Sequence, residues 1–272
     1  TKSKPAGAFA GNYNATAKVP EALENDASVP QGHGWTQTNV STAGVITGGG
    51  RTPDGGTFTL GGALWPAGQV PIYVLLYKNK GSLHGEELLV SDAASTFANN
   101  TLGGTLRLIK TGPSATADRT YRIGYGPVAL ELDGEKWVKP STLRLLLGAI
   151  DAGINNATLD FAQGGLDALT EDALDQPFRI TNTHTAKLAL SGGVDNPKKV
   201  VLTFSTATGT FTGSFKLVDP NPANAALKIT RTVPINGVLR RDQGWGHFVL
   251  PEMPGTATSP AWSGAVEIKP GL

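Results

Sequence analysis

Short apolar runs alternate with turns rich in Gly, Pro and Asn along most of the chain. Runs of strand length with a turn signal about every ten residues are typical of an antiparallel β-sandwich or β-barrel. Strands are predicted at 9–19, 35–40, 45–51, 57–64, 72–77, 83–90, 105–110, 186–191, 200–205, 210–218, 226–233, 237–241, 247–250 and 265–269. The predicted fold class is therefore mainly β and antiparallel.

Two of these runs predict how their side chains are distributed. In the run 210–217 every second residue is apolar around Gly213, so Phe211, Phe215 and Leu217 are predicted to be buried together, with the polar residues between them facing outward. The run 72–77 is apolar at every position, which predicts a central strand covered on both faces.

The chain also contains an internal repeat. The segment 70–84, VPIYVLLYKNKGSLH, matches 233–247, VPINGVLRRDQGWGH, without a gap, and both begin with Val-Pro-Ile and end in His. Flanking segments match in the same order: 44–48 with 209–213, and 104–108 with 264–268. The shared order predicts a duplicated unit and hence two related β-barrel or β-sandwich halves. The alternative is that Gly-rich β sequence resembles itself.

Within the repeat, Gly81 and Gly244 each follow an Asn or Asp by two residues, between an apolar run and the next strand. A short hairpin loop uses a polar residue that bonds its own backbone and a glycine with positive φ. The sequence therefore predicts equivalent strand pairs at 70–89 and 233–251, with positive φ at both glycines.

The middle of the chain has no partner in the repeat. Asp133-Gly134 predicts a hairpin turn after a strand at 128–132. One or two short helices are predicted: 166–174 has the best helical spacing, and 141–150 is either a short helix or a strand. The expected organisation is a first β unit at 1–112, a connecting segment at 113–184 and a second β unit at 185–272.

Composition narrows the function classes. The 272 residues carry a formal net charge of +1 with 17% charged residues, and no dense Lys/Arg cluster is present, which argues against nucleic-acid binding. No apolar run reaches the roughly eighteen residues that a membrane-spanning helix needs, so no membrane span is predicted.

The chain has no cysteine, which excludes disulfides, thiolate metal sites and a cysteine nucleophile. Low charge, abundant Thr, Gly and Asn, and short strands favour an exported protein, placed outside the cell or on its surface. The start at Thr1, without an initiator Met, suggests a piece of a longer precursor.

Nearly the whole chain resembles a duplicated β domain found near the C-terminus of large exported bacterial proteins that carry immunoglobulin-like repeats. The resemblance rests on structural turns and strands at 209–219, 237–239, 244–251 and 263–266 in the second half, and at 52–56, 71–77 and 81–85 in the first. It implies an exported, multi-domain setting and no catalytic residue.

The candidate chemistry is sparse. His84 and His247 occupy equivalent positions in the repeat, but neither has a second histidine or a carboxylate at ligand spacing, and His33 and His184 stand alone. We therefore predict structural histidines, no metal site and no cofactor.

Three acidic residues and five tryptophans are the remaining candidates. Glu131, Asp133 and Glu135 suggest the carboxyl pair of a glycosidase, but they flank the predicted turn, so a solvated hairpin tip is the preferred interpretation. A tryptophan ring can stack on the apolar face of a sugar, or it can pack in a core or cover a barrel end. The tryptophans are Trp35, Trp65, Trp137, Trp245 and Trp262, and Trp245 lies between two glycines in a predicted loop, where a ring can be exposed. Packing in a core or covering a barrel end is the preferred interpretation for each of them.

The sequence therefore predicts a non-enzymatic β module of an exported or cell-surface bacterial protein, acting in adhesion, as a scaffold or in binding. No catalytic residue is assigned, and the sequence leaves the ligand-binding residues unknown. The expected partners are other domains of a longer precursor or a surface glycan. The alternative is a carbohydrate-active domain, either glycan-binding or similar to a glycoside hydrolase, that uses Trp and Asp/Glu.

Overall fold

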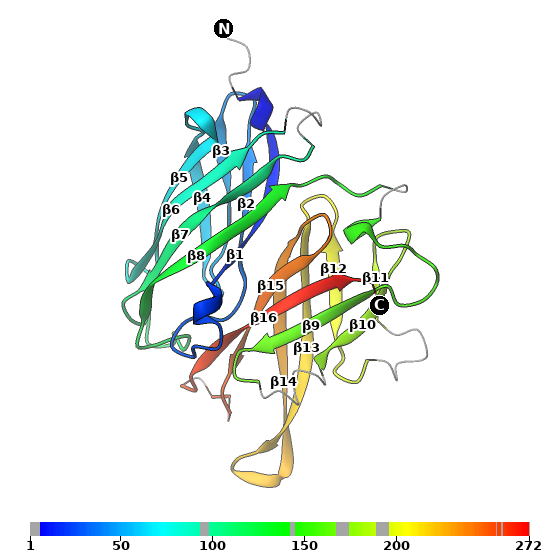
Figure 1. Ribbon diagram of the computed structural model, residues 1–272. Coiled ribbons are helices and arrows are strands. Elements are labelled where there is room, and N and C mark those ends of the chain that lie inside the picture. The colour runs from blue at the N-terminus through cyan, green and yellow to red at the C-terminus, as the bar shows by residue number, and fades with distance from the viewer. Residues whose placement is uncertain are drawn as a thin grey trace.

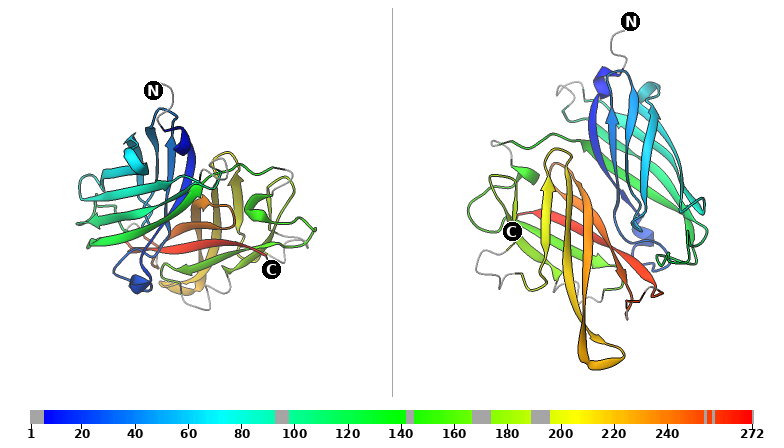
Figure 2. Two further views of the ribbon diagram at one scale, coloured as in Figure 1. Left: turned by 45° about the horizontal axis from the view of Figure 1, so that its top comes forward. Right: turned by 180° about the vertical axis from the view of Figure 1, so that it is seen from behind.

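The protein consists of two antiparallel β-barrels that lie side by side (Figures 1 and 2). The computed structural model describes residues 6–92, 98–141, 145–166, 174–188, 196–253, 255–256 and 258–271. Each barrel is an eight-stranded sheet that curls until its two outer strands approach each other. The predicted all-β, antiparallel fold with two related halves is confirmed.

The strands follow one another as a meander in each barrel. The first barrel contains β1 (Gly11–Lys18), β2 (Gly34–Val40), β3 (Val45–Arg51), β4 (Thr57–Ala63), β5 (Gln69–Leu76), β6 (Gly81–Val90), β7 (Thr101–Lys110) and β8 (Tyr125–Lys136). The second contains β9 (Ala157–Gln163), β10 (Gln176–Ile180), β11 (Ala186–Lys187), β12 (Val201–Ser205), β13 (Thr210–Asn221), β14 (Asn224–Leu239), β15 (Gly244–Pro251) and β16 (Ala261–Pro270).

In each barrel the first strand pairs with the last strand, which links the two ends of the meander. β1 pairs with β8 and β9 pairs with β16, both antiparallel. The remaining seam lies between β4 and β5 in the first barrel and between β11 and β12 in the second. The segment 113–184, which has no partner in the repeat, thus contributes β8 to the first barrel and β9 and β10 to the second.

The helical elements with described bounds are single 3-10 turns: η1 (Gly7–Phe9), η2 (Glu21–Leu23), η3 (Pro66–Gly68) and η5 (Leu146–Gly148). Only η5 falls in the predicted helix-or-strand segment 141–150, where residues 142–144 lie outside the described part of the chain. Most of the predicted helix 166–174 also lies outside the described residues. Within its described residues the segment 141–150 therefore forms one 3-10 turn, because apolar residues at helical spacing also suit a turn packed on a barrel, and the helix at 166–174 stays a prediction.

The repeated hairpin is confirmed in its register. Leu76 pairs with Gly81 in the first barrel, and Leu239 pairs with Gly244 in the second, so both hairpins have four-residue loops. Tyr73 lies opposite His84, just as Asn236 lies opposite His247. The matching apolar positions of the two strands are all buried: Val70 and Val233, Ile72 and Ile235, and Leu76 and Leu239.

The upstream part of the repeat is not equivalent in the two barrels. β3 is separated from β5 by β4 in the first barrel, whereas β13 pairs directly with β14 in the second. The sequence match between 44–48 and 209–213 therefore joins segments of similar composition that occupy different positions in the two sheets. The structure shows two similar barrels, which suggests a duplicated β domain. The hairpin is the part of the repeat whose pairing register is the same in both, although β5 is an outer strand and β14 is paired on both sides.

The predicted positive φ at Gly81 and Gly244 is wrong. In the first hairpin the left-handed residues are Tyr77, Lys78 and Asn79, with φ of 53°, 54° and 68°, and neither glycine belongs to the positive-φ group. Gly81 is needed for space instead, because a Cβ there would lie 2.1 Å from the carbonyl oxygen of Ile109 on β7.

Two other local predictions are also wrong. The apolar run in β5 forms an outer strand whose Tyr73 and Leu75 side chains are exposed, at 71% and 56%. Asp133-Gly134 is not a turn but part of β8, where a Cβ on Gly134 would lie 2.4 Å from the Cβ of Ala15 on β1. The Asp-Gly pair predicted a turn from local composition alone. In the structure Gly134 is needed because its missing Cβ lets β8 pack closely against β1.

The predicted burial on β13 is confirmed. Phe211, Phe215 and Leu217 are at most 3% exposed and belong to one apolar cluster inside the second barrel, whereas Thr212 and Lys216 are exposed. A second apolar cluster fills the first barrel.

Candidate functional site

The two barrels are joined by a polar interface centred on Asn14 of β1. Its side chain is 1% exposed, and its amide nitrogen donates to three carbonyl oxygens of the second barrel: Thr208 at 3.1 Å, Gly209 at 2.9 Å and Leu239 at 3.0 Å. Gly209 is required at this contact, because a Cβ there would lie 2.3 Å from the Asn14 amide nitrogen. These bonds fix one barrel against the other, since a buried carbonyl that loses its donor is destabilising.

Three of the five tryptophans belong to the same interface. Trp35 on β2 donates its indole N–H to Asn236 Oδ1 on β14 at 3.2 Å, and Trp137, just after β8, donates to the carbonyl oxygen of Thr206 at 3.1 Å. Trp245 lies in β15, only 6% exposed, with the Lys18 ammonium 4.8 Å from its ring centroid. The predicted loop around Trp245 is wrong, because this residue lies in a strand whose flanking glycines let neighbouring strands approach. The burial of its ring agrees with the preferred interpretation of the tryptophans as packed side chains.

A cleft runs along the line where the barrels meet, and it has two parts that share Gln31 and Gln163. The first, which we call the acidic pocket, has a volume of about 230 Å³ and is lined by Val19, Glu24, Gln31, His33, Asp160, Phe161, Ala162, Gln163, Ala265, Glu267 and Lys269. The second, the tryptophan pocket, has a volume of about 400 Å³ and is lined by Asn25, Ala27, Gln31, Tyr121, Gln163, Gly164, Gly165, Leu166, Glu252, Trp262 and Ser263. The larger part lies in the size range of small-ligand sites, about 300 to 1,000 Å³.

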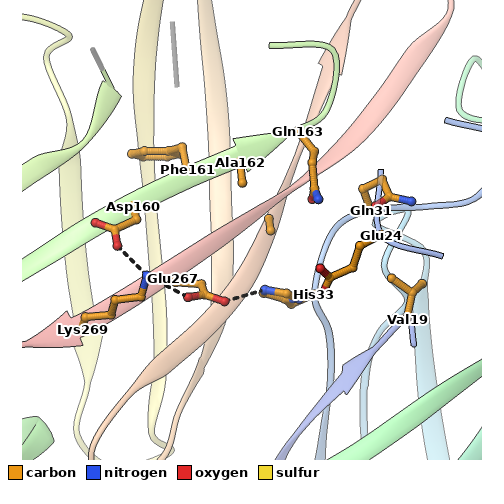
Figure 3. A pocket seen from close by; sticks show the side chains of 11 residues that line it. Val19, Glu24, Gln31, His33, Asp160, Phe161, Ala162, Gln163, Glu267 and Lys269 are labelled. Atoms are coloured by element: carbon orange, nitrogen blue, oxygen red, sulfur yellow. Dashed lines mark hydrogen bonds and ion pairs between the residues drawn. The ribbon is translucent and has the colours of Figure 1, made fainter. Parts of the chain in front are cut away.

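In the acidic pocket four side chains form a continuous polar network (Figure 3). His33 Nε2 lies 3.1 Å from Glu267 Oε1, Lys269 Nζ lies 3.2 Å from Glu267 Oε2, and the same ammonium lies 2.8 Å from Asp160 Oδ2. These residues come from β2, β16 and β9. Strand alternation sends Asp160 and Glu267, which are opposite each other in the β9–β16 register, out of the same face of the second barrel.

The network determines the protonation states of its members. The hydrogen bond from His33 lowers the pKa of Glu267 to about 2, and Lys18 and Lys269 act in the same direction. Burial lowers the pKa of His33, so its ring is neutral at pH 7. Because an ionised carboxylate only accepts, His33 donates from Nε2, and its buried Nδ1 atom has no hydrogen-bond partner. Glu267 thus remains an ionised acceptor, the opposite of what a general acid requires.

The tryptophan pocket presents an aromatic ring beside a carboxylate. Trp262 packs edge-on against Tyr121, with ring centroids 5.3 Å apart, and its indole N–H donates to Glu252 Oε1 at 2.5 Å. Tyr121 in turn lies 3.2 Å from the Ser263 hydroxyl. These contacts fix the orientation of the Trp262 ring at the wall of the cleft.

Two non-glycine residues on opposite sides of the cleft have left-handed backbones. Asn25 has φ of 68° and Gln163 has φ of 62°, and the Gln163 amide donates to Asn25 Oδ1 at 3.3 Å across the gap between the barrels. Asparagine tolerates this conformation, whereas for glutamine it is uncommon. Such backbones gather at ligand sites and turns, where the surrounding structure holds them.

The histidines lie apart from one another, except for one pair. His247 is 2% exposed, and its Nδ1 lies 3.3 Å from the carbonyl oxygen of His33, so it helps to join the barrels. Its repeat equivalent, His84, lies beside Tyr73 on the other barrel, and His184 lies in a turn. Within the described residues no group of three His, Cys, Asp or Glu side chains is arranged to hold a metal ion.

The carboxylates considered from the sequence lie on β8 and face the hairpin loop between β14 and β15. Asp133 pairs with Arg240, and Glu135 lies 3.6 Å from Arg241. They join the barrels by ion pairs and do not line the cleft, while Glu131 is exposed. The predicted solvated hairpin tip is therefore wrong, because β8 continues through these residues.

Of the residues that line the cleft, only Trp262 and His33 were candidates from the sequence, and His33 was not expected to have a partner. Asp160, Glu267 and Lys269 come from strands far apart in the chain, and nothing local distinguishes them from ordinary outward-facing polar residues. The available signal was the strand at 265–269, in which Glu267 and Lys269 are the polar positions of an alternating pattern.

One carboxyl does have a raised pKa, but it lies outside the cleft. Burial inside the first barrel raises the pKa of Glu87 to about 7. Its Oε2 accepts a hydrogen bond from Thr38 at 2.7 Å, and its Oε1 is buried without a partner, as is the Thr36 hydroxyl. Glu87 is 0% exposed, so the residue with the pKa of a general acid is closed off from any substrate.

In the part of the chain that the structure describes, no helix has the length and apolar character needed to cross a membrane. No protein-family model matches the chain, and no curated protein is significantly similar to it.

Proposed function

We propose that the protein is a non-enzymatic β module of an exported or cell-surface bacterial protein, and that it acts by binding a ligand in the cleft between its barrels. The observation that carries the proposal is the protonation state of the cleft. Glu267, at the centre of the acidic pocket, is held ionised by His33 and Lys269, so this network supplies fixed acceptors and no proton donor matched to glycoside hydrolysis.

The rigid connection between the barrels also supports a binding role. Asn14, Trp35 and Trp137 each contribute hydrogen bonds between the barrels, so the cleft is preformed. A preformed site loses less conformational entropy on binding than one that must be ordered by its ligand. The exported, multi-domain setting is a proposal that rests on the low charge, the abundance of Thr, Gly and Asn, and the resemblance of the strand motifs. The absence of cysteine fits a reducing compartment equally well.

A carbohydrate-active domain is the second candidate, and the tryptophan pocket favours it. Trp262 offers a flat ring at the cleft wall, and Glu252 beside it can accept hydrogen bonds from hydroxyl groups. This candidate shares the site and differs from the first in whether a glycosidic bond is cleaved.

The test is to incubate the purified chain with a panel of soluble polysaccharides, measuring affinity by calorimetry and bond cleavage by the release of reducing ends. We expect binding without cleavage, weakened by Trp262→Ala and unchanged by Trp65→Ala, a control because Trp65 is 55% exposed on the first barrel, outside both pockets. Release of reducing ends that Glu252→Gln or Asp160→Asn abolishes would overturn the non-enzymatic proposal in favour of the second candidate.

The proposed location needs a separate test in the producing bacterium. Protease added to intact cells should digest the chain, while a cytoplasmic marker survives. Protection equal to that of the marker would contradict export.

A further inference from the structure

The cleft combines an aromatic wall with an excess of negative charge. Four carboxylates line its two pockets, Glu24, Asp160, Glu252 and Glu267, against the ammonium group of Lys269 and that of Lys18, which lies 3.9 Å from Glu267 Oε1. His33 adds no charge at neutral pH, because burial lowers its pKa. An anionic ligand would meet repulsion along this lining, whereas a cationic ligand would be attracted.

The structure already contains an ammonium group held in this lining. Lys269 Nζ lies between Asp160 and Glu267, at 2.8 Å and 3.2 Å, and the lysine side chain is 49% exposed. A half-exposed lysine is only weakly held by such a pair and can swing away into solvent. The space between the two carboxylates is therefore a position that fits an ammonium and can be vacated for an incoming one.

The floor of the acidic pocket favours a flat polar ligand over a peptide strand. Ala162 and Ala265 lie opposite each other in the β9–β16 register, next to Asp160 and Glu267, so small side chains form a shallow surface between the charges. Along the pocket β16 is hydrogen-bonded to β9 on one side and to β15 on the other, so this strand offers no free backbone edge for an added strand. Contact with a ligand here is through side chains.

We propose that the cleft binds a polysaccharide of amino sugars whose amino groups are unsubstituted. The Trp262 ring stacks on the apolar face of one sugar, and the ammonium groups of neighbouring sugars contact Glu24, Asp160 and Glu267. This inference rests on the proposed binding function and specifies its ligand class: a hydroxylated chain that carries positive charge.

The experiment compares three oligosaccharides of equal length by calorimetry: glucosamine, N-acetylglucosamine and glucose oligomers. N-Acetylation removes the charge of the amino group and keeps the sugar ring. At low salt we expect the glucosamine oligomer to bind about tenfold more tightly than the other two, because one charge-assisted hydrogen bond contributes a free energy of about that size. That preference should shrink at high salt, because exposed charges are screened.

Variants separate the two contributions. Asp160→Asn and Glu24→Gln should reduce the preference for glucosamine while leaving the weaker binding of the glucose oligomer unchanged, and Trp262→Ala should weaken all three. Glu131→Gln is the matched control, since Glu131 is an exposed carboxylate on β8 outside both pockets. Circular dichroism of each variant verifies folding.

Each outcome bears on one of the two proposals. Equal binding of the three oligomers would overturn the amino-sugar inference and leave the binding function standing. Tight binding of polylysine that Trp262→Ala does not affect would also overturn it, pointing to a cationic protein partner. If all three oligomers fail to bind the folded wild-type chain, the amino-sugar inference fails, while binding of another polysaccharide from the wider panel would still uphold the proposed function.

Discussion

Both barrels are eight-stranded meanders that contain a hairpin of the same register, yet their interiors are built differently. The second barrel is filled by apolar side chains that include a cluster of three phenylalanines, in which Phe215 lies 4.8 Å from Phe161 and 5.4 Å from Phe248 between ring centroids. The first barrel encloses Glu87 with Thr36 and Thr38. A meander barrel therefore requires inward-facing positions of suitable volume, and it tolerates a change from aromatic to polar content at those positions.

The polar content of the first barrel continues to one of its ends. Lys110 is buried there, with Nζ 3.1 Å from Asp118 Oδ2 and 3.9 Å from Asp54 Oδ2, and the Tyr77 hydroxyl donates to Asp54 at 2.9 Å. Truncating one member of such a network would leave its partners buried and unpaired. Stability of the first barrel thus depends on buried polar and charged groups in addition to its apolar cluster, whereas the interior of the second barrel is stabilised mainly by apolar packing.

The largest expected effect tests the aromatic core. Phe215→Ala should lower the free energy of unfolding by about 3 to 5 kcal/mol, because it removes a 0% exposed ring that contacts two others. Urea denaturation measures the loss. Thr212→Ala, at an exposed position of the same strand, is the control and should change stability by about 0.5 kcal/mol or less. A loss below 1 kcal/mol for Phe215→Ala would contradict the packing account.

The next effect tests the buried carboxyl of the first barrel. The pKa of Glu87 is about 7 in the folded protein and 4.5 in the reference state, so the folded state binds more protons between these values. The contribution of Glu87 to stability is therefore largest below pH 4.5 and is lost as the pH rises through 7, a change of about 3 kcal/mol.

Glu87→Gln should remove that part of the pH dependence and stabilise the chain at pH 8, measured as free energy of unfolding from pH 4.5 to 8. Glu86→Gln, on the exposed face of the same strand, is the matched control and should retain the wild-type slope. An unchanged slope in Glu87→Gln would show that another group carries the dependence.

The smallest effect tests the two equivalent glycines of the hairpins. A Cβ on Gly81 would lie 2.1 Å from a backbone carbonyl of β7, but on Gly244 the nearest atom is the Leu239 Cδ2 at 2.9 Å, the end of a side chain that can move. Gly81→Ala should therefore cost about 1 to 3 kcal/mol and Gly244→Ala less, about 1 kcal/mol. Thermal denaturation of both, with Gly61→Ala on the open face of β4 as control, measures the order. A larger loss of stability for Gly244→Ala than for Gly81→Ala would contradict the argument that the distance to the nearest atom sets the cost of the added Cβ.

The sequence alone determined the structural features that depend only on residues close together in the chain. Alternation at Phe211, Phe215 and Leu217 determined which face of β13 is buried, since successive side chains of a strand point to opposite sides. The repeated segments at 70–84 and 233–247 determined two hairpins of one register, because loop length and apolar positions together fix the pairing. Both properties are local, so a single sequence is enough to predict them.

Tertiary structure alone decided the features that depend on which strands meet. The apolar run of β5 became an outer strand, because composition does not say how many neighbours a strand has. Burial by the barrel wall raised the pKa of Glu87, and His33, Asp160 and Glu267 became one network only when β2, β9 and β16 came together. Electrostatic interactions of this kind act through space across segments far apart in the chain, so no local pattern in the sequence records them.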